Sequence, residues 1–164
     1  MPTAKEEGEQ MVLLSDLQSL VAGWWFDYDQ GNFDAWPGYF TADARFSCRS
    51  DSRATAFEEF VTADVRGRDA VLAWNTQHRK DSPYPLRHNG TNIHVVSGGE
   101  DACRFRSYIF VTQIVGMGVS PLASGVVVGA ARREDGELRF SEMEVVLDFT
   151  DSHAFNDATR FELF

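Results

Sequence analysis

Residues Arg87–Val95, with the sequence RHNGTNIHV, place a histidine at the mouth of a predicted strand. Far upstream, a predicted helix closes with the aromatic and acidic run WWFDYD at Trp24–Asp29. A carboxylate on such a helix and a histidine beside such a strand can form a proton-transfer pair inside an apolar pocket. These two stretches therefore define both the expected fold and its candidate site.

The N-terminal half of the chain is predicted to be mainly helical. From Met11, apolar residues recur at helical spacing, which indicates a helix with one buried face: Leu13, Leu17, Leu20, Val21 and Trp24. Gly31 is a natural stop for this helix. We expect a second short helix from Phe33 to about Phe40, a turn at 41–43, a first strand at 44–48 and a third helix at 67–76. Residues 55–60 are ambiguous.

After the breaker cluster DSPYP at 81–85 the periodicity changes to two. Segments rich in β-branched and aromatic residues predict four strands, at 91–96, 102–114, 124–133 and 138–149. Gly-Gly and Asp-Gly steps between them predict antiparallel hairpins. Helices followed by strands indicate an α+β fold. Three helices cannot cover both faces of four such strands, so we expect a cone-shaped α+β barrel. In it the N-terminal helices pack into a strongly curved, mostly antiparallel sheet, and its interior is the default ligand site.

Length and composition indicate one domain over residues 10–164, preceded by a flexible acidic tail at 1–9. The formal charge of −10 argues against nucleic-acid binding, because an acidic surface repels phosphate. The supply of rings, 13 Phe, 4 Trp and 4 Tyr, suits a cavity for a flat apolar ligand. No apolar run approaches the length of a membrane span and no secretory signal is visible, so we expect a cytoplasmic protein without membrane contact.

The two cysteines, Cys48 and Cys103, lie in strand-like segments and are expected to be half-buried thiols rather than a disulfide. Neither C-x-x-C nor H-x-x-x-H spacing occurs, so the sequence predicts no metal site. No Gly-rich phosphate cradle precedes a helix, so no organic cofactor is expected either.

Five motifs occur in an order that resembles the nuclear transport factor 2-like superfamily: DQGNFD at 29–34, YFTADARF at 39–46, RHNGTNIHV at 87–95, RSYIFV at 106–111 and EVVLD at 144–148. The groups most similar are the SnoaL-like and scytalone dehydratase-like proteins and the small β subunits of aromatic-ring-hydroxylating dioxygenases. The short interval before the Arg-His strand, with GRDAV at 67–71, favours the SnoaL-like group. PLRH at 85–88 and FELF at 161–164 favour the β subunits.

The resemblance implies that Asp29 and His88 carry out acid–base chemistry. A carboxylate that accepts from one imidazole nitrogen fixes the tautomer, and the other nitrogen can then exchange a proton with a substrate. Trp24 stands where the catalytic pattern often has a tyrosine, and Tyr108 is our candidate for the missing phenol. The expected pocket residues are Trp24, Trp25, Tyr28, Phe46 and Asn92.

A purely structural interpretation stays open, because the β subunits keep the same Asp and His without chemistry. In that interpretation Asp29 caps the turn at Gly31 and His88 is a satisfied half-buried histidine. Two other histidines, His78 and His94, are expected on the surface.

The sequence thus predicts a cofactor-independent lyase or isomerase acting on a hydrophobic oxygenated ring substrate by dehydration, double-bond shift or cyclisation. The alternatives are a non-catalytic dioxygenase β subunit bound to a metal-bearing α subunit, or a small-molecule-binding module. The resemblance also implies a homotrimer or a homodimer.

Overall fold

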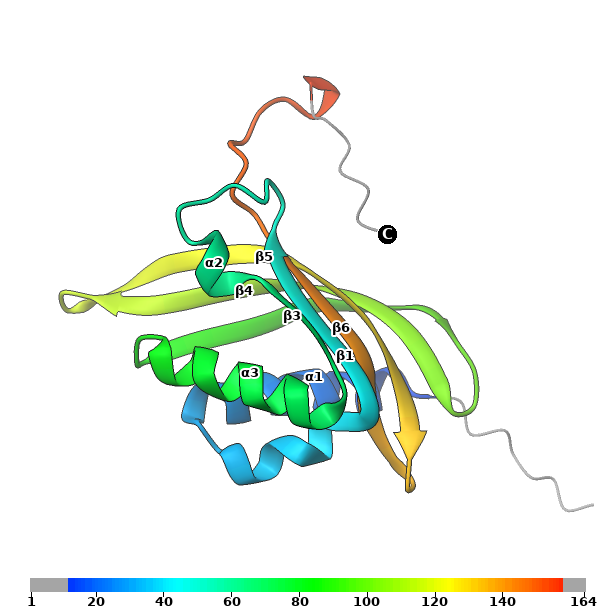
Figure 1. Ribbon diagram of the computed structural model, residues 1–164. Coiled ribbons are helices and arrows are strands. Elements are labelled where there is room, and N and C mark those ends of the chain that lie inside the picture. The colour runs from blue at the N-terminus through cyan, green and yellow to red at the C-terminus, as the bar shows by residue number, and fades with distance from the viewer. Residues whose placement is uncertain (1–11, 158–164) are drawn as a thin grey trace, which may run out of the picture.

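Six strands form one open, strongly curved sheet in the order β2-β1-β6-β5-β4-β3 (Figure 1). The computed structural model describes residues 12–157. The strands are β1 Phe40–Ser50, β2 Ala63–Arg66, β3 Leu86–Gly98, β4 Ala102–Val115, β5 Gly118–Glu134 and β6 Glu137–Leu147. All neighbours pair antiparallel except β1 and β6, which are parallel.

The predicted α+β class and the mostly antiparallel, curved sheet are confirmed. The sheet is not closed, because β2 and β3 remain as edges. It is therefore a cone with one open side rather than a complete barrel. The predicted tail at 1–9 and the FELF segment at 161–164 lie outside the described residues.

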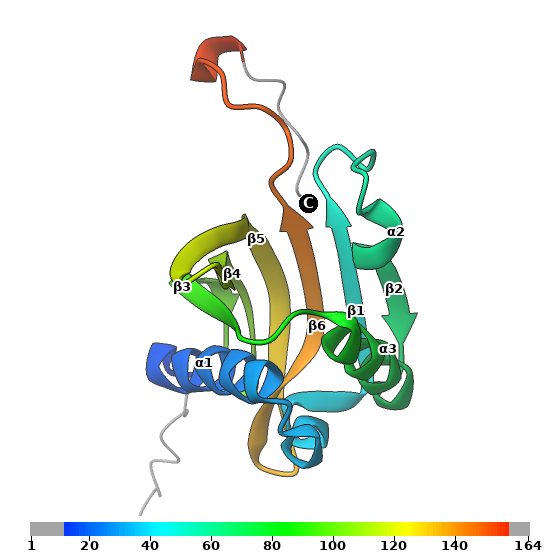
Figure 2. The same ribbon diagram turned by 90° about the vertical axis from the view of Figure 1, so that its left-hand side faces the viewer.

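The helices are α1 Leu14–Gln30, the 3-10 helix η1 Phe33–Tyr39, the short α2 Glu58–Val61, α3 Arg68–Asp81 and the 3-10 turn η2 Phe155–Asp157. α1 and α3 lie against the concave side of the sheet, whereas η2 stands away from it, beyond the end of β6 (Figure 2). α1 packs on β3, and α3 packs on β1. Because α1 and α3 pack on different parts of the sheet, a space remains between them that a cavity can occupy.

The first helix forms for the reason that the sequence suggests. Leu17, Val21 and Trp24 are almost fully buried and recur at helical spacing. The helix ends at Gly31, which adopts φ 68° and donates its N–H to the carbonyl oxygen of Tyr28. This left-handed turn places Asp29 in the last turn of α1.

The structure departs from the sequence-based expectation at three places. The expected turn at 41–43 is part of β1, whose register on β6 shifts between Phe40 and Arg45, so the turn-like residues form a β-bulge. Residues 63–66 form an edge strand that the sequence did not reveal. The third helix continues to Asp81, five residues beyond its predicted end at Thr76.

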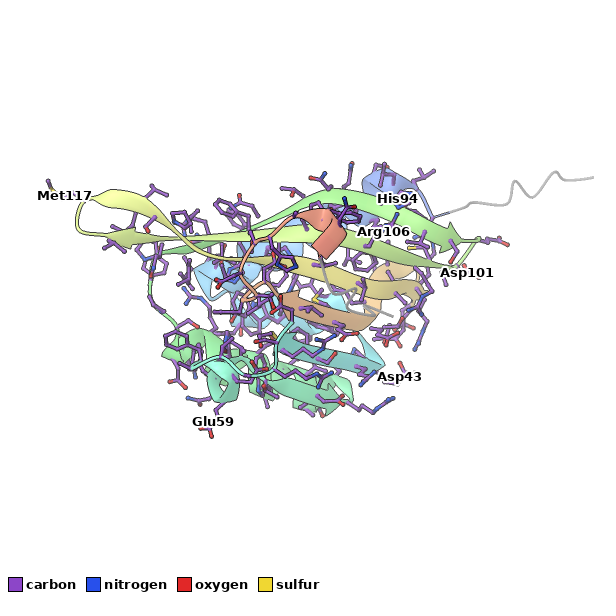
Figure 3. All side chains as sticks on the ribbon, turned by 90° about the horizontal axis from the view of Figure 1, so that it is seen from above. Asp43, Glu59, His94, Asp101, Arg106 and Met117 are labelled. Atoms are coloured by element: carbon purple, nitrogen blue, oxygen red, sulfur yellow. The ribbon has the colours of Figure 1, made fainter. Side chains whose placement is uncertain are left out.

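From Ala102 to Val111, residues of β4 alternate strictly between exposed and buried. Phe105, Ile109 and Val111 face the core, whereas Tyr108 and Phe110 face outward. The outer face also carries His94 of β3, which accepts a hydrogen bond from Nε of Arg106 over 3.2 Å (Figure 3). His94 is exposed, as predicted.

Cys48 and Cys103 are both buried and unpaired, in agreement with the prediction of two thiols. Among residues 12–157, no helix combines the length and the apolar character that crossing a membrane requires.

Candidate active site

A cavity of about 330 Å³ lies between the concave face of the sheet and the helices. Its wall is mainly apolar and is built from several elements, with Trp25 from α1, Phe46 from β1, Phe60 from α2, Trp74 from α3 and Ile109 from β4 among the lining residues. This volume falls in the range of small-molecule sites. The few polar groups on such a wall decide which ligand can bind.

Asp29 and His88 meet at this cavity. The backbone N–H of His88 donates to Oδ2 of Asp29 over 2.7 Å, and Nδ1 of the ring lies 2.5 Å from Oδ1. The Asp29 side chain is only 4% exposed and that of His88 12%. Because both carboxylate oxygens accept from one residue, the imidazole is held with Nδ1 protonated and Nε2 carrying its lone pair.

Trp25 fixes the plane of this imidazole. Its indole stacks on the His88 ring with centroids 4.9 Å apart and an angle of 9°. Tyr28, one turn further along α1, meets the same imidazole edge-on at 5.2 Å. His88 lines the cavity, and its Nε2 has no hydrogen-bond partner in the part of the chain that the structure describes. A ligand in the cavity can therefore reach a nitrogen that is free to accept a proton.

Arg79 of α3 holds the end of α1 in place. It is 6% exposed, and it donates from Nε to the carbonyl oxygen of Tyr28 over 3.0 Å and from Nη2 to that of Asp29 over 2.9 Å. Its Nη1 donates to the carbonyl oxygen of Pro83 over 3.1 Å. The carbonyls of Tyr28 and Asp29 belong to the negative end of the α1 dipole, where the backbone of the helix itself no longer supplies N–H donors. One buried cation thus ties α1, α3 and the segment before β3 together.

A second polar pair lies on the same wall. The hydroxyl of Tyr28 and Nδ1 of His78 are 2.6 Å apart. Both residues line the cavity. The prediction that His78 lies on the surface is wrong, because α3 extends past it and turns it inward. Its spacing from Val71 and Trp74, positions i+7 and i+4, was the signal for that buried face.

The structure brings five of the eight predicted site residues together. Asp29 and His88 form the pair, and Trp25, Tyr28 and Phe46 line the cavity beside it.

The other three are not at the site. Trp24 is 0% exposed and packs on Trp36 and Phe40 in the core. Tyr108 is 56% exposed on the outer face of β4, so it cannot supply the missing phenol. Asn92 is exposed, with φ 54°, where the β3–β4 register shifts, so it is a bulge residue and not a pocket residue.

Comparison with known families agrees with this architecture. A family model of the SnoaL-like domain matches residues 13–144. The chain belongs to the SnoaL-like family. A search of curated protein sequences finds no match.

Several solved structures share the fold of this SnoaL-like domain. A Mycobacterium tuberculosis protein of unknown function is 23% identical, with a TM-score of 0.68 over 89% of this chain and 79% of that one. A proposed scytalone dehydratase from Novosphingobium aromaticivorans is 15% identical, with a TM-score of 0.66 over 86% of this chain and 88% of its own.

The β subunit of a proposed aromatic-ring-hydroxylating dioxygenase from the same organism is 14% identical, with a TM-score of 0.66 over 86% of this chain and 92% of its own. At these identities the likeness shows the fold that the SnoaL-like domain shares with both groups.

Proposed function

We propose that this SnoaL-like domain is a cofactor-independent lyase or isomerase for a hydrophobic, oxygenated ring compound, and that His88 is its general base and then its general acid. The observation that carries the proposal is the Asp29–His88 pair, which is joined by two hydrogen bonds. The His88 side chain, with Nε2 free of such bonds to the described residues, lines an open apolar cavity.

The proposed reaction begins when Nε2 of His88 removes a proton from a carbon or a hydroxyl of the bound ring. Asp29 balances the positive charge that His88 then carries, and it keeps the ring oriented through Nδ1. The Trp25 stack prevents the imidazole from rotating. His88 can return the proton either to another carbon, which shifts a double bond, or to a leaving hydroxyl, which leaves as water.

The cavity supports chemistry over a purely structural role. A subunit that uses Asp29 and His88 only for packing has no need of an empty space beside Nε2. The apolar wall excludes water, and this favours proton transfer between His88 and a ligand over exchange with solvent.

A turnover screen tests the proposal. Cyclic ketones and hydroxy ketones would be incubated with the protein, and loss of water or migration of a double bond would be followed by mass spectrometry and NMR. We expect at least one compound to react, and Asp29→Asn and His88→Ala to lower its turnover by about a hundredfold or more. Tyr108→Phe is the matched control, because Tyr108 is exposed on the outer face.

Other results point elsewhere. Unchanged turnover in His88→Ala removes the mechanism. Tight binding without turnover favours a binding module. Co-purification with a larger iron–sulfur protein favours the dioxygenase β-subunit role.

We also propose a homo-oligomer, a trimer or a dimer, formed by the outer face of the sheet. Tyr108 and Phe110 expose 56% and 43% of their surface on adjacent outward positions of β4, and apolar exposure of this kind is typical of contact surfaces. Light scattering after gel filtration would give the oligomer number, and a monomer at micromolar concentration would contradict this assembly.

A further inference from the structure

His78 is the second histidine of the cavity wall, and its surroundings differ from those of His88. Its ring stacks on Trp74 with centroids 4.8 Å apart and an angle of 14°, and Phe60 meets it at 4.6 Å. Nδ1 is 2.6 Å from the hydroxyl of Tyr28. Nε2 is buried and has no hydrogen-bond partner among the described residues.

Both members of the Tyr28–His78 pair are uncharged near neutral pH. Burial raises the pKa of the Tyr28 phenol well above its usual range. Burial, reinforced by the nearby charges of His88 and Arg79, lowers the pKa of His78 to about 4. The Tyr28 hydroxyl has no other hydrogen-bond partner among the described residues, so we infer that it donates its proton to Nδ1 of His78. The one proton of the neutral imidazole then resides on Nε2.

An N–H donor that is buried without an acceptor is rare in folded proteins, because it has lost its water and gained nothing in return. The rings of Trp74 and Phe60 lie against the His78 imidazole, and neither ring carries an oxygen or nitrogen atom that could accept a hydrogen bond from Nε2–H. His78 lines the cavity. A molecule that enters the cavity beside His78 can supply the acceptor that Nε2–H lacks.

We propose that Nε2–H of His78 is the oxygen-binding group of the cavity, and that it donates a hydrogen bond to a carbonyl oxygen of the ring compound on which His88 acts. This inference rests on the proposed function. The Tyr28 ring lies 5.2 Å from the His88 ring and 6.5 Å from the His78 ring, so both imidazoles border the same chamber. The substrate class is then a cyclic ketone or enone.

The electron balance explains why two imidazoles are useful. Nε2 of His88 takes a proton from the carbon next to the carbonyl, and the electrons of that C–H bond form a C=C bond. The carbonyl π electrons move onto oxygen, where Nε2–H of His78 stabilises the negative charge. If the ring carries a second double bond next to the deprotonated carbon, the resulting dienolate takes the proton back at its far carbon and the double bond shifts. If the ring carries a hydroxyl on the β carbon, the enolate expels it as hydroxide, which receives the proton from His88 and leaves as water. No further reactant is needed.

Two probes that differ only in the carbonyl test this assignment. 1-Tetralone carries the ketone oxygen, and tetralin has the same ring skeleton without it. Dissociation constants would be measured by ligand-observed NMR for both. We expect the wild type to prefer 1-tetralone by about three- to tenfold, which is the range of a neutral hydrogen bond.

Variants of His78 test whether this residue causes the preference for 1-tetralone over tetralin. His78→Phe should bind both probes equally, because the ring remains and the donor is lost. His78→Gln should restore part of the preference, because its amide nitrogen takes the place of Nε2. His94→Phe is the matched control, since His94 is exposed on the outer face. It should bind as the wild type does.

Tyr28 is the positioning residue of this pair. With ¹⁵N-labelled histidine, the wild type should show His78 with a protonated Nε2 and a bare Nδ1. In Tyr28→Phe the spectrum should show a mixture of tautomers, with a weaker preference for 1-tetralone. A wild type without a preference for the ketone, or a preference that survives in His78→Phe, overturns the proposal. Repeating the binding in His88→Asn separates this result from the loss of turnover, because equilibrium binding does not depend on proton transfer by His88.

Discussion

Arg79 holds the backbone of Asp29: its Nη2 donates to the Asp29 carbonyl oxygen over 2.9 Å, while the Asp29 carboxylate holds His88. The candidate site is thus fixed by a chain of contacts from α3 to α1 to β3. Arg79→Met should remove the guanidinium donor from the carbonyls of Tyr28, Asp29 and Pro83, and among the described residues only that of Tyr28 keeps another donor, the N–H of Gly31. We expect a loss of about 2–4 kcal/mol in the free energy of unfolding.

Urea denaturation would measure this loss, with Arg87→Met as the control, because Arg87 is exposed on β3. Arg79→Lys should fall between wild type and Arg79→Met, since one ammonium cannot serve three carbonyls in a fork. Equal stability of all four proteins would show that Arg79 does not anchor the site.

Because Gly90 has no side chain, the Trp25 indole can pack closely against the backbone of β3 and stack on His88. A Cβ at residue 90 would lie 2.8 Å from Cγ1 of Val21 and 3.1 Å from Cδ1 of Trp25. Gly90→Ala should therefore displace the indole and cost about 1–3 kcal/mol of stability. Thermal melting would measure the stability, and turnover of a substrate from the ketone screen would measure the site. Gly99→Ala, where a Cβ meets nothing within 4 Å, should change neither. A Gly90→Ala protein that melts and reacts like the wild type would argue against this packing.

His78 should make stability depend on pH in a defined window. The folded-state pKa of about 4 is below the usual value of 6.5, so the unfolded chain binds the proton more tightly. Stability should therefore be complete above about pH 6.5 and should fall as the pH drops toward 4. The expected loss is about 2–3 kcal/mol.

Urea denaturation at several pH values would reveal this component as the difference between wild type and His78→Phe. Asp43 and Glu58 have lowered pKa values, so their contributions to stability begin to fall near the usual carboxyl values of 3.8 and 4.5, at the lower edge of the same window. This loss occurs in both proteins and cancels in the difference. Parallel pH profiles for the two proteins would show that His78 is not buried as a neutral ring.

Cys48 lines the cavity, but its thiol should be inert. Burial raises its pKa to about 12, so the thiolate needed for nucleophilic attack is scarce at neutral pH. We expect native protein to react slowly with a thiol reagent at pH 8 and urea-unfolded protein to react fast at both cysteines. Cys48→Ala should keep turnover within about threefold, in line with a wall residue that makes no transition-state contact. Rapid modification of the native protein would contradict the buried environment.

Much of the fold follows from local sequence signals. The helical spacing before Gly31 and the period-two pattern after Pro85 reflect which side chains must be buried, and burial is what the structure shows. The expected turn at 41–43 failed because a β-bulge uses similar residues without interrupting the strand. The edge strand β2 has only four residues, too few for a periodic signal.

The site was predictable only in part. Asp29 and His88 stood out through their motifs, but His78 did not, because the predicted helix stopped at Thr76. Tyr108 was assigned to the wrong face, although it alternates with Arg104 and Arg106, whose charges mark the outward side. The hydrogen bonds of Arg79 to backbone carbonyls leave no trace in a sequence pattern, since any carbonyl can accept them.

Deuterium incorporation from D₂O into 1-tetralone at its α carbon, compared between wild type and His88→Asn, would show whether His88 transfers a proton to and from a bound ketone. The asparagine amide can take the place of Nδ1–H at Asp29, so the buried carboxylate keeps a donor, while the nitrogen that accepts the proton is removed. A role of His88 as the general base predicts catalysed exchange in the wild type and a loss of about a hundredfold or more in the variant at an unchanged melting temperature. Equal exchange in both proteins would contradict it.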